Sequence, residues 1–326
     1  MFSRIGLTVL GLTMAIASSG AMAQAYPDKP VKVEVGYVPG PTGPDYAARV
    51  VAPKLSELLG QPFVVENKPG ASGTIATAFV ANAAPDGYTL LLGETAQLEI
   101  APFLFKNLPY DTLKSLTPIG LITDAAGLVI VSNAKVTDIR SIHDLIREAK
   151  ARPGSIAYGT AGVGSIHHIA MELFQDGTGI KLNHVPFKGG GESLPAFLGG
   201  QVPILIAALQ RVWPYVKNGD VNILAVTAGA RLPAIGDVPS LSEIIPGYAV
   251  ESQLGLLAPA KLPDAILETL STNLNKALMD RALREKLGVE GTRSIKWMSP
   301  NDYSSLIKSN QAMFRRAIDI AGIKPE

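Results

Sequence analysis

Apolar and polar positions follow two periodic patterns along the chain, one typical of strands and one typical of helices. Residues 31–35 alternate strictly and stop at Gly36, which is typical of a strand, whereas residues 45–59 carry apolar side chains at helical spacing and stop at Gly60. Read in this way, the sequence predicts strands at 31–35, 63–65, 89–92, 128–131, 155–158, 181–187, 202–207 and 221–227, with an extended return segment at 247–257. It predicts helices at 45–59, 73–83, 142–152, from Ser165 onward, at 192–198, 212–217, 263–287 in one or two pieces, and 300–321.

The alternation of strand and helix indicates the fold class. A β-α-β-α order favours an α/β fold in which a mostly parallel sheet carries helices on both faces. The order occurs twice, before and after residue 124, without a low-complexity linker or a sequence repeat. We therefore expect two lobes joined by strands, with residues 24–124 plus 253–326 in lobe 1 and residues 125–252 in lobe 2. The C-terminal helices are expected to return to lobe 1.

The first 23 residues have the pattern of a secretory signal peptide. Arg4 precedes an uncharged apolar run at 5–17, and Ala21-Met22-Ala23 places small residues at the two positions that a signal peptidase reads. The apolar run is shorter than the ~20 residues that span a bilayer, which disfavours the alternative of a membrane anchor. We expect cleavage after Ala23, export of the mature chain and a periplasmic location.

Composition narrows the possible functions. Lysine plus arginine number 29 against 28 aspartate plus glutamate, and the balance becomes even once Arg4 is removed with the signal. No basic surplus therefore favours a nucleic-acid partner. The chain has no cysteine, which excludes disulfides, thiolate metal ligands and thiol catalysis.

The most distinctive stretch is YGTAGVGSIHHIAMELF, residues 158–174. Its glycines lack the spacing of a dinucleotide or phosphate-binding motif, and no G-x-S-x-G or H-E-x-x-H sequence occurs elsewhere. His167 and His168 could be read as metal ligands. Adjacent helical residues point about 100° apart, however, and a zinc site needs three or four convergent ligands. The sequence thus predicts no cofactor and no metal.

Two glycine-rich loops follow strands and open helices. The first covers residues 37–45 and the second residues 159–165. A helix N-terminus carries unpaired N–H groups and a partial positive charge, so such a loop can bind an anion without a basic side chain. In an open α/β sheet it also lies at the carboxyl ends of the strands, where ligands bind. Either loop alone could equally be an ordinary turn, the second one capped by Ser165. The pair favours one anionic ligand held between two lobes.

A series of short motifs marks a family resemblance. They are Tyr26-Pro-Asp-Lys-Pro30, Pro39-Gly40 with Asp45 and Ala48-Arg49, Gly60-Gln-Pro62, Val65-Glu-Asn-Lys-Pro-Gly70, Ala84-Pro-Asp-Gly-Tyr-Thr-Leu90, Leu108-Pro-Tyr-Asp111, His184-Val-Pro-Phe-Lys-Gly189, Gly199-Gly-Gln201, Asp237-Val-Pro239 and Gly255-Leu-Leu-Ala-Pro259. In this number and order they resemble the Bug-type periplasmic solute receptors of tripartite tricarboxylate transporters, from Tyr26 to the C-terminus.

The resemblance implies a two-lobe periplasmic binding protein of the Venus-flytrap type. It implies no enzymatic activity, a small organic mono- or dicarboxylate as ligand, membrane permease subunits as partners and a monomeric receptor. In the family the two loops hold the ligand carboxylate, largely through backbone N–H groups and water. Carried onto this sequence, the expected ligand-binding residues are Tyr37, Gly40, Thr42, Gly43, Asp45, Thr95, Ala96, Thr160, Gly162, Gly164, Ser165, His167, Arg211 and Gln253.

This sequence departs from the family pattern at several of these positions. Pro41 and Pro44 remove two N–H donors from the first loop. His168 matches a histidine common in the family, so we expect it to be structural. His167 replaces a small hydroxyl residue and is expected to face the ligand. Arg211 could pair with a second carboxylate, or it could be an exposed surface arginine.

Two other functions remain open at this point. An exported hydrolase would need a nucleophile beside a base, and Ser165 with His167 is the one candidate pair. Residues two apart on a helix do not face each other, which disfavours that pair. A sensor subunit that presents its ligand to a membrane kinase would share every feature described so far.

Overall fold

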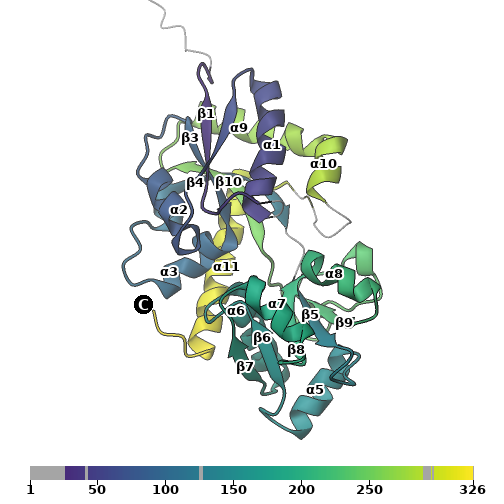
Figure 1. Ribbon diagram of the computed structural model, residues 1–326. Coiled ribbons are helices and arrows are strands. Elements are labelled where there is room, and N and C mark those ends of the chain that lie inside the picture. Colours follow the sequence, from purple (N-terminus) through teal and green to yellow (C-terminus); the bar gives the residue numbers. More distant parts are fainter. Residues whose placement is uncertain (1–25, 41–42, 125–127, 289–294, 296, 326) are drawn as a thin grey trace, which may run out of the picture.

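The computed structural model describes residues 26–40, 43–124, 128–288, 295 and 297–325. The expected signal peptide, its cleavage after Ala23 and the expected ligand residue Thr42 lie outside the described residues. Figure 1 shows two α/β lobes, one above the other, each built on a sheet with helices around it. Within the described ranges, no helix has both the length and the apolar character needed to cross a membrane.

The first lobe is built on a five-stranded sheet in the order β2-β1-β3-β10-β4. Strands β1, β2 and β3 pair in parallel, and β10 runs antiparallel to both β3 and β4. The bounds are Phe63–Asn67 for β2, Val31–Val35 for β1, Thr89–Glu94 for β3, Gln253–Pro259 for β10 and Leu116–Asp124 for β4.

The second sheet repeats this arrangement in the order β7-β6-β8-β5-β9. Strand β6 pairs in parallel with β7 and β8, and β5 runs antiparallel to β8 and β9. The bounds are Asn183–Pro186 for β7, Ala157–Thr160 for β6, Ile204–Ala208 for β8, Leu128–Asn133 for β5 and Val221–Val226 for β9.

Each sheet therefore has four strands in one direction and one reversed strand in the same place. The reversed strands are β10 and β5, which are the strands by which the chain enters each lobe from the other one. A strand that arrives from the facing lobe enters its sheet from the opposite end, which explains its direction. The prediction of a two-lobe α/β fold with mostly parallel sheets is confirmed.

Helices cover both faces of each sheet. In lobe 1 they are α1 (Gly43–Leu59), α2 (Thr74–Ala81), α3 (Ala101–Leu104), α4 (Thr112–Ser115), α9 (Asp264–Met279) and α10 (Arg281–Leu287), with a π-helix η2 (Ala96–Ile100) after β3. In lobe 2 they are α5 (Ile142–Ala151), α6 (Ile166–Thr178), α7 (Gly190–Leu198) and α8 (Leu209–Lys217). A capping box at Ser141 and Asp144 begins α5.

Strand β5 is a continuous apolar run because both of its faces are buried. Leu128 and Ile130 pack into the core beneath α5 and α6, whereas Val129 and Val131 pack into the core beneath α7 and α8. Successive side chains of a strand point to opposite faces, so a strand buried on both faces must be apolar at every position. The same argument holds for Leu90, Leu91 and Leu92 of β3.

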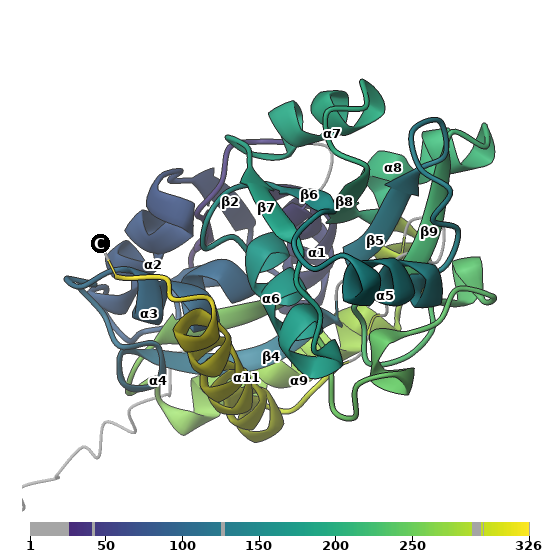
Figure 2. The same cartoon turned by 90° about the horizontal axis from the view of Figure 1, so that it is seen from below.

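The last helix, α11 (Pro300–Ile320), differs from the sequence prediction. Its first half belongs to lobe 1, where Tyr303 and Ile307 are buried with residues of β3 and β10. Its second half packs on lobe 2, where Phe314 and Ile318 join the core around α6. Figures 1 and 2 show α11 lying alongside α6 in both views. The helix returns to lobe 1 as expected, but it is long enough to bridge both lobes.

The sequence did not predict strand β4, the π-helix after β3 or the short helices α3 and α4. Strand β4 contains Pro118 and Gly120, which read as breaker signals; the strand lies at the edge of its sheet, where proline is tolerated. The segment after β3 forms a π-helix that continues into α3, and π-helices lack a sequence signature of their own.

Candidate ligand-binding site

Two adjacent cavities lie where the two lobes face each other. Their volumes are about 690 Å³ and about 360 Å³. Glu94 of lobe 1 and Ile166 and His167 of lobe 2 line both cavities, so these three residues form the boundary between them. The larger cavity also reaches the C-terminal residues Ala321 to Lys324.

The cavities lie at the carboxyl ends of parallel strands from both sheets. Tyr37 follows β1, Glu94 ends β3 and Ala161 follows β6, while Gln210 and Arg211 follow β8. Strand ends and the helix starts after them are the ligand-binding edge of an open α/β sheet. The fold therefore points both binding edges into one cleft.

The second glycine-rich loop is held by its own hydrogen bonds. The Gly162 amide donates to Thr160 Oγ1 (3.1 Å), and the Gly164 amide donates to His168 Nδ1 (3.2 Å). Ser165 caps α6, because its hydroxyl accepts from the His168 amide (3.3 Å) and donates to the Gly162 carbonyl (2.7 Å). Among the bonds between described residues, none uses the amides of Val163, Ile166 or His167. All three residues line the larger cavity.

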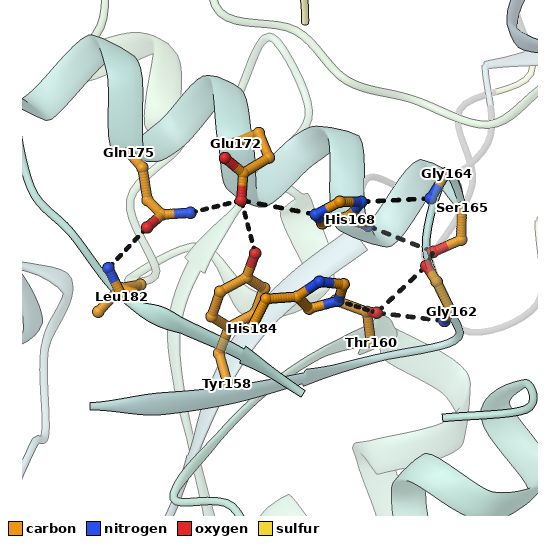
Figure 3. Close-up of polar contacts among 10 residues, drawn as sticks. All are labelled: Tyr158, Thr160, Gly162, Gly164, Ser165, His168, Glu172, Gln175, Leu182 and His184. Carbon is orange, nitrogen blue, oxygen red and sulfur yellow. Dashed lines mark hydrogen bonds and ion pairs between the residues drawn. The ribbon is translucent and has the colours of Figure 1, made fainter. Parts of the chain in front are cut away.

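His168 belongs to a buried network beneath this loop (Figure 3). Its ring stacks on His184 with centroids 3.9 Å apart, and His184 Nε2 lies 2.7 Å from Thr160 Oγ1. Tyr158 donates to Glu172 Oε1 (2.7 Å), which lies 3.6 Å from His168 Nε2. Burial lowers the pKa of both His168 and His184 to about 4, so both rings are neutral at pH 7. The network supports the prediction that His168 holds the fold.

The first loop has a different anchor. Asp45, 2% exposed in the first turn of α1, accepts hydrogen bonds from the Gly40 amide (3.1 Å), Arg49 Nε (3.1 Å) and Asn67 Nδ2 (2.7 Å). Burial opposes ionisation of Asp45, but these bonds outweigh it and lower the pKa of the carboxyl. The Gly40 amide is thus used inside the loop.

His167 and Arg211 face the cleft from lobe 2. Burial between the lobes, together with the nearby Arg211 cation, lowers the pKa of His167 to about 4. Arg211 lies over Gly190 at the start of α7, where an added Cβ would approach its Nη1 to 2.5 Å. Within the described part of the chain, no carboxylate lies within ion-pair distance of Arg211. Arg211 is therefore an exposed cation at the smaller cavity.

Glu94 faces the cleft from lobe 1. Its Oε1 accepts a hydrogen bond from the Ser252 hydroxyl (2.7 Å), and Ser252 also lines the smaller cavity. Burial, with the Glu94 carboxylate beside it, raises the pKa of the Tyr37 phenol well above its usual value. Tyr37 therefore remains a neutral hydroxyl next to Glu94.

The predicted site residues divide into two groups. Those that line the cavities are Tyr37, Gly43, Ala96, Gly164, Ser165, His167 and Arg211. Those that the structure places outside the lining are Gly40, Asp45, Thr95, Thr160, Gly162 and Gln253. The members of the second group are buried or used in bonds within the protein.

Thr95 and Gln253 are held by hydrogen bonds within the protein. Thr95 Oγ1 accepts from the Gln253 amide (2.9 Å) and donates to the Glu251 carbonyl (3.3 Å), while Gln253 Oε1 accepts from Asn310 Nδ2 (3.0 Å). Both side chains are buried and tie β3, β10 and α11 together. Thr160 is held in the same way, because its fully buried hydroxyl is bonded to His184 and to the Gly162 amide.

Several lining residues were not among the expected ligand-binding residues. Glu94 is the last residue of β3 and follows an apolar run at 90–92, and a charge at such a strand end is a usable sequence signal. Ile166, Ser193 and Leu104 carry no such signal, because they resemble ordinary helix residues. The described residues contain no group of three or more His, Asp or Glu side chains arranged to hold a metal ion.

Comparison with known proteins gives a consistent result. The chain matches the model of the tripartite tricarboxylate transporter family receptor over residues 47–323. The protein BugT of Bordetella pertussis is 34% identical over 293 residues, which cover 89% of this chain and 89% of BugT. A solved structure of R. palustris Rpa4515 with adipate is 30% identical, with a TM-score of 0.77, and covers 92% of this chain and 100% of that chain.

A second solved structure, MatC from Rhodopseudomonas palustris with bound malate, is 27% identical with a TM-score of 0.72. It covers 90% of this chain and 100% of that chain. The family match spans most of the sequence, and these relatives cover nearly all of the described fold. The resemblance seen in the sequence motifs is confirmed: this chain belongs to the receptor family of the tripartite tricarboxylate transporters.

Proposed function

We propose that this protein is a periplasmic solute receptor that binds a small organic mono- or dicarboxylate between its lobes. It would deliver this ligand to the membrane permease subunits of a tripartite tricarboxylate-type transporter. Family membership supports the receptor role, and the relatives with adipate and malate support a carboxylate as the ligand class.

One observation carries the proposal. The amides of Val163, Ile166 and His167 lack acceptors among the described residues, and they belong to a loop and helix start that line the cleft. These groups can donate to a carboxylate, and the partial positive charge of the α6 N-terminus adds to the attraction. Arg211 supplies a full positive charge at the adjoining cavity.

The neutral state of His167 fits this role. With a pKa near 4, its ring can donate one N–H to a ligand oxygen without adding charge. On this basis the proposed ligand contacts are the cavity-lining members of the predicted set, with His167 and Arg211 as the side chains that select the ligand. Arg211 would hold one end of a dicarboxylate.

The hydrolase alternative has no support from the candidate pair. The Ser165 hydroxyl donates to the Gly162 carbonyl and accepts from the His168 amide, so both of its roles serve the helix cap. A nucleophilic serine would instead donate to a base. We therefore propose a receptor that performs no chemistry on its ligand. Presentation of the ligand to a membrane kinase is the second candidate role, because it requires the same binding of a ligand between the lobes as transport does.

The remaining parts of the proposal concern the mature protein. The sequence pattern of the first 23 residues supports signal cleavage after Ala23 and a periplasmic location, and the family resemblance supports a monomer. The order of strands and helices supports lobes of 24–124 plus 253–326 and 125–252. The two lobe assignments also agree with the passage of the chain between the sheets, before β5 and before β10.

The experiment is ligand-induced thermal stabilisation of the purified mature chain across mono- and dicarboxylates, sugars and cations. A true ligand at 100 times its Kd should add about 2.7 kcal/mol to the free energy of unfolding, which gives a readable rise in Tm. A rise with carboxylates alone is expected. A rise with sugars or cations, and none with any carboxylate, would overturn the proposal.

A further inference from the structure

The smaller cavity contains two charged side chains of opposite sign. Of its lining residues, Glu94 is acidic and Arg211 is basic, while the others are apolar or uncharged; His167 is neutral. Glu94 comes from the end of β3 in lobe 1, and Arg211 comes from α8 in lobe 2. The two lobes therefore present one charge each to the same space.

Neither charge is paired within the described part of the chain. No ion pair at 4.0 Å or less joins Glu94 to any described lysine or arginine, and the same holds for Arg211 and the described carboxylates. Glu94 accepts a hydrogen bond from Ser252 and lies beside the Tyr37 phenol, both uncharged groups. A partly buried carboxylate without a cation is costly, so a ligand that supplies one is favoured.

A simple carboxylate ligand would meet an unfavourable charge here. Glu94 lines both cavities, so a ligand anion in either one lies near a second negative charge. Like charges in a partly desolvated cleft repel strongly. A dicarboxylate that lies across both cavities would bring one of its anionic ends toward Glu94.

We propose that the preferred ligand is an amino carboxylate, with its ammonium group on Glu94 and its carboxylate on Arg211 and the free amides of the second loop. This inference rests on the proposed function and specifies its ligand class. Ser252 and Tyr37 orient the Glu94 carboxylate, and Glu94 is the residue that selects the ammonium group. The larger cavity, lined by Ile100, Leu104 and Ile166, accepts the apolar part of the ligand.

Glu94 and Arg211 could instead contact each other directly when the lobes close. In that case Glu94 would only neutralise Arg211. Its removal would then change the affinity for every carboxylate by the same factor and leave the preference between them unchanged.

The experiment measures Kd by calorimetry for matched ligands on one skeleton at a time: a four-carbon chain, a six-carbon chain and a phenyl ring. Each set contains the monocarboxylate, the dicarboxylate and the amino carboxylate. The full mature chain is compared with Glu94→Gln, which keeps the side-chain shape and the acceptor for Ser252. Glu268→Gln, a change on the lobe 1 helix α9 away from the cleft, is the matched control.

On at least one skeleton, the amino carboxylate is expected to bind about tenfold or more tightly than the dicarboxylate, since a charge-assisted bond is gained and a repulsion avoided. Glu94→Gln should remove this preference, and Glu268→Gln should keep it. A dicarboxylate that binds as tightly as its amino counterpart, or a preference that survives in Glu94→Gln, overturns this inference alone. Failure of every carboxylate to bind overturns the proposed function and this inference with it.

Discussion

The two glycine-rich loops look alike in sequence but differ in how the structure holds them. The loop before α1 is anchored by one carboxylate, Asp45, which ties Gly40, Arg49 and Asn67 together. The loop before α6 is anchored by aromatic rings and hydroxyls, with His168 stacked on His184 and Thr160 bonded to the Gly162 amide. The groups that contact the first loop include a carboxylate, whereas those that contact the second loop directly are a neutral imidazole and hydroxyls.

This difference bears on what each loop can offer a ligand. In the second loop the anchoring bonds use the glycine amides and leave the amides of Val163, Ile166 and His167 without acceptors among the described residues. In the first loop the Gly40 amide is used and Pro44 has none, and the loop contributes Tyr37 and Gly43 to the cavity linings.

Removal of the lobe 2 cation should have the largest effect on binding. Arg211→Gln is expected to weaken a carboxylate ligand between about 10- and 100-fold, since a hydrogen bond to a charged group contributes about 1.5–3 kcal/mol. Calorimetric Kd values measure this. Lys217→Gln, an exposed cation on the same helix, is the control and should bind as the wild type does. An equal loss in both variants would assign the effect to net charge.

The anchor of the first loop should matter for stability. Asp45→Asn removes a buried charge and replaces one of the two acceptor oxygens by an NH2 group, so the donors of Gly40, Arg49 and Asn67 can no longer all be satisfied, at a cost of about 2 kcal/mol in the free energy of unfolding. Denaturant titration measures it. The control is Asp264→Asn, an exposed first-turn aspartate of α9, for which a helix-dipole loss of about 0.5 kcal/mol is expected. Similar losses in the two variants would contradict the anchoring role.

The anchor of the second loop should make stability depend on pH. The unfolded histidines bind protons near pH 6.5, whereas His168 and His184 in the folded protein do so near pH 4. The unfolded state therefore binds more protons between these values, and the free energy of unfolding falls as the pH falls from 6.5 to 4.

His168→Phe keeps a ring on His184 and should reduce this fall by about 2 kcal/mol. Denaturant titrations at pH 7, 5.5 and 4 test it, with the exposed His143→Gln as control. An unchanged fall in His168→Phe would contradict the contribution of His168 to the acid sensitivity.

The free amides of the second loop can be tested one at a time. Ile166 is the first residue of α6 and Ser165 before it is extended, so proline fits at position 166 without loss of a protein hydrogen bond. Ile166→Pro should therefore retain stability but weaken a carboxylate ligand by about 1 kcal/mol, close to fivefold. Ile166→Val trims the side chain and keeps the amide, and it should bind more tightly than Ile166→Pro. Equal affinities would remove this amide from the site.

Most of the fold could be predicted because local patterns and core burial agree. The expected strands at 31–35 and 128–131, the helix that ends before Gly60 and the helix that begins after Ser165 lie where the sequence placed them. Strand β4 was missed because Pro118 and Gly120 outweigh its apolar positions unless its place at the sheet edge is known. The sequence did not predict that α11 packs on both lobes, because the apolar positions of a helix do not specify which lobe buries them.

The candidate site was predictable at the level of loops, not of side chains. The strand–glycine–helix pattern located both loops, and His167 and Arg211 line the cavities as expected. Thr95, Thr160 and Gln253 were expected there as well, but each side chain is bonded within the protein. The direction of a side chain at a strand end depends on which neighbours bury it, and the sequence does not specify those neighbours.

The sequence by itself determined the class of the fold, its two-lobe organisation, the family and the two glycine-rich loops that follow strands. These follow from periodicity, glycine positions and short motifs, all of which are local. Only the tertiary structure decided that Glu94 and Arg211 share one cavity from opposite lobes. These two residues are more than a hundred positions apart in the sequence, and only the packing of the two lobes brings them together.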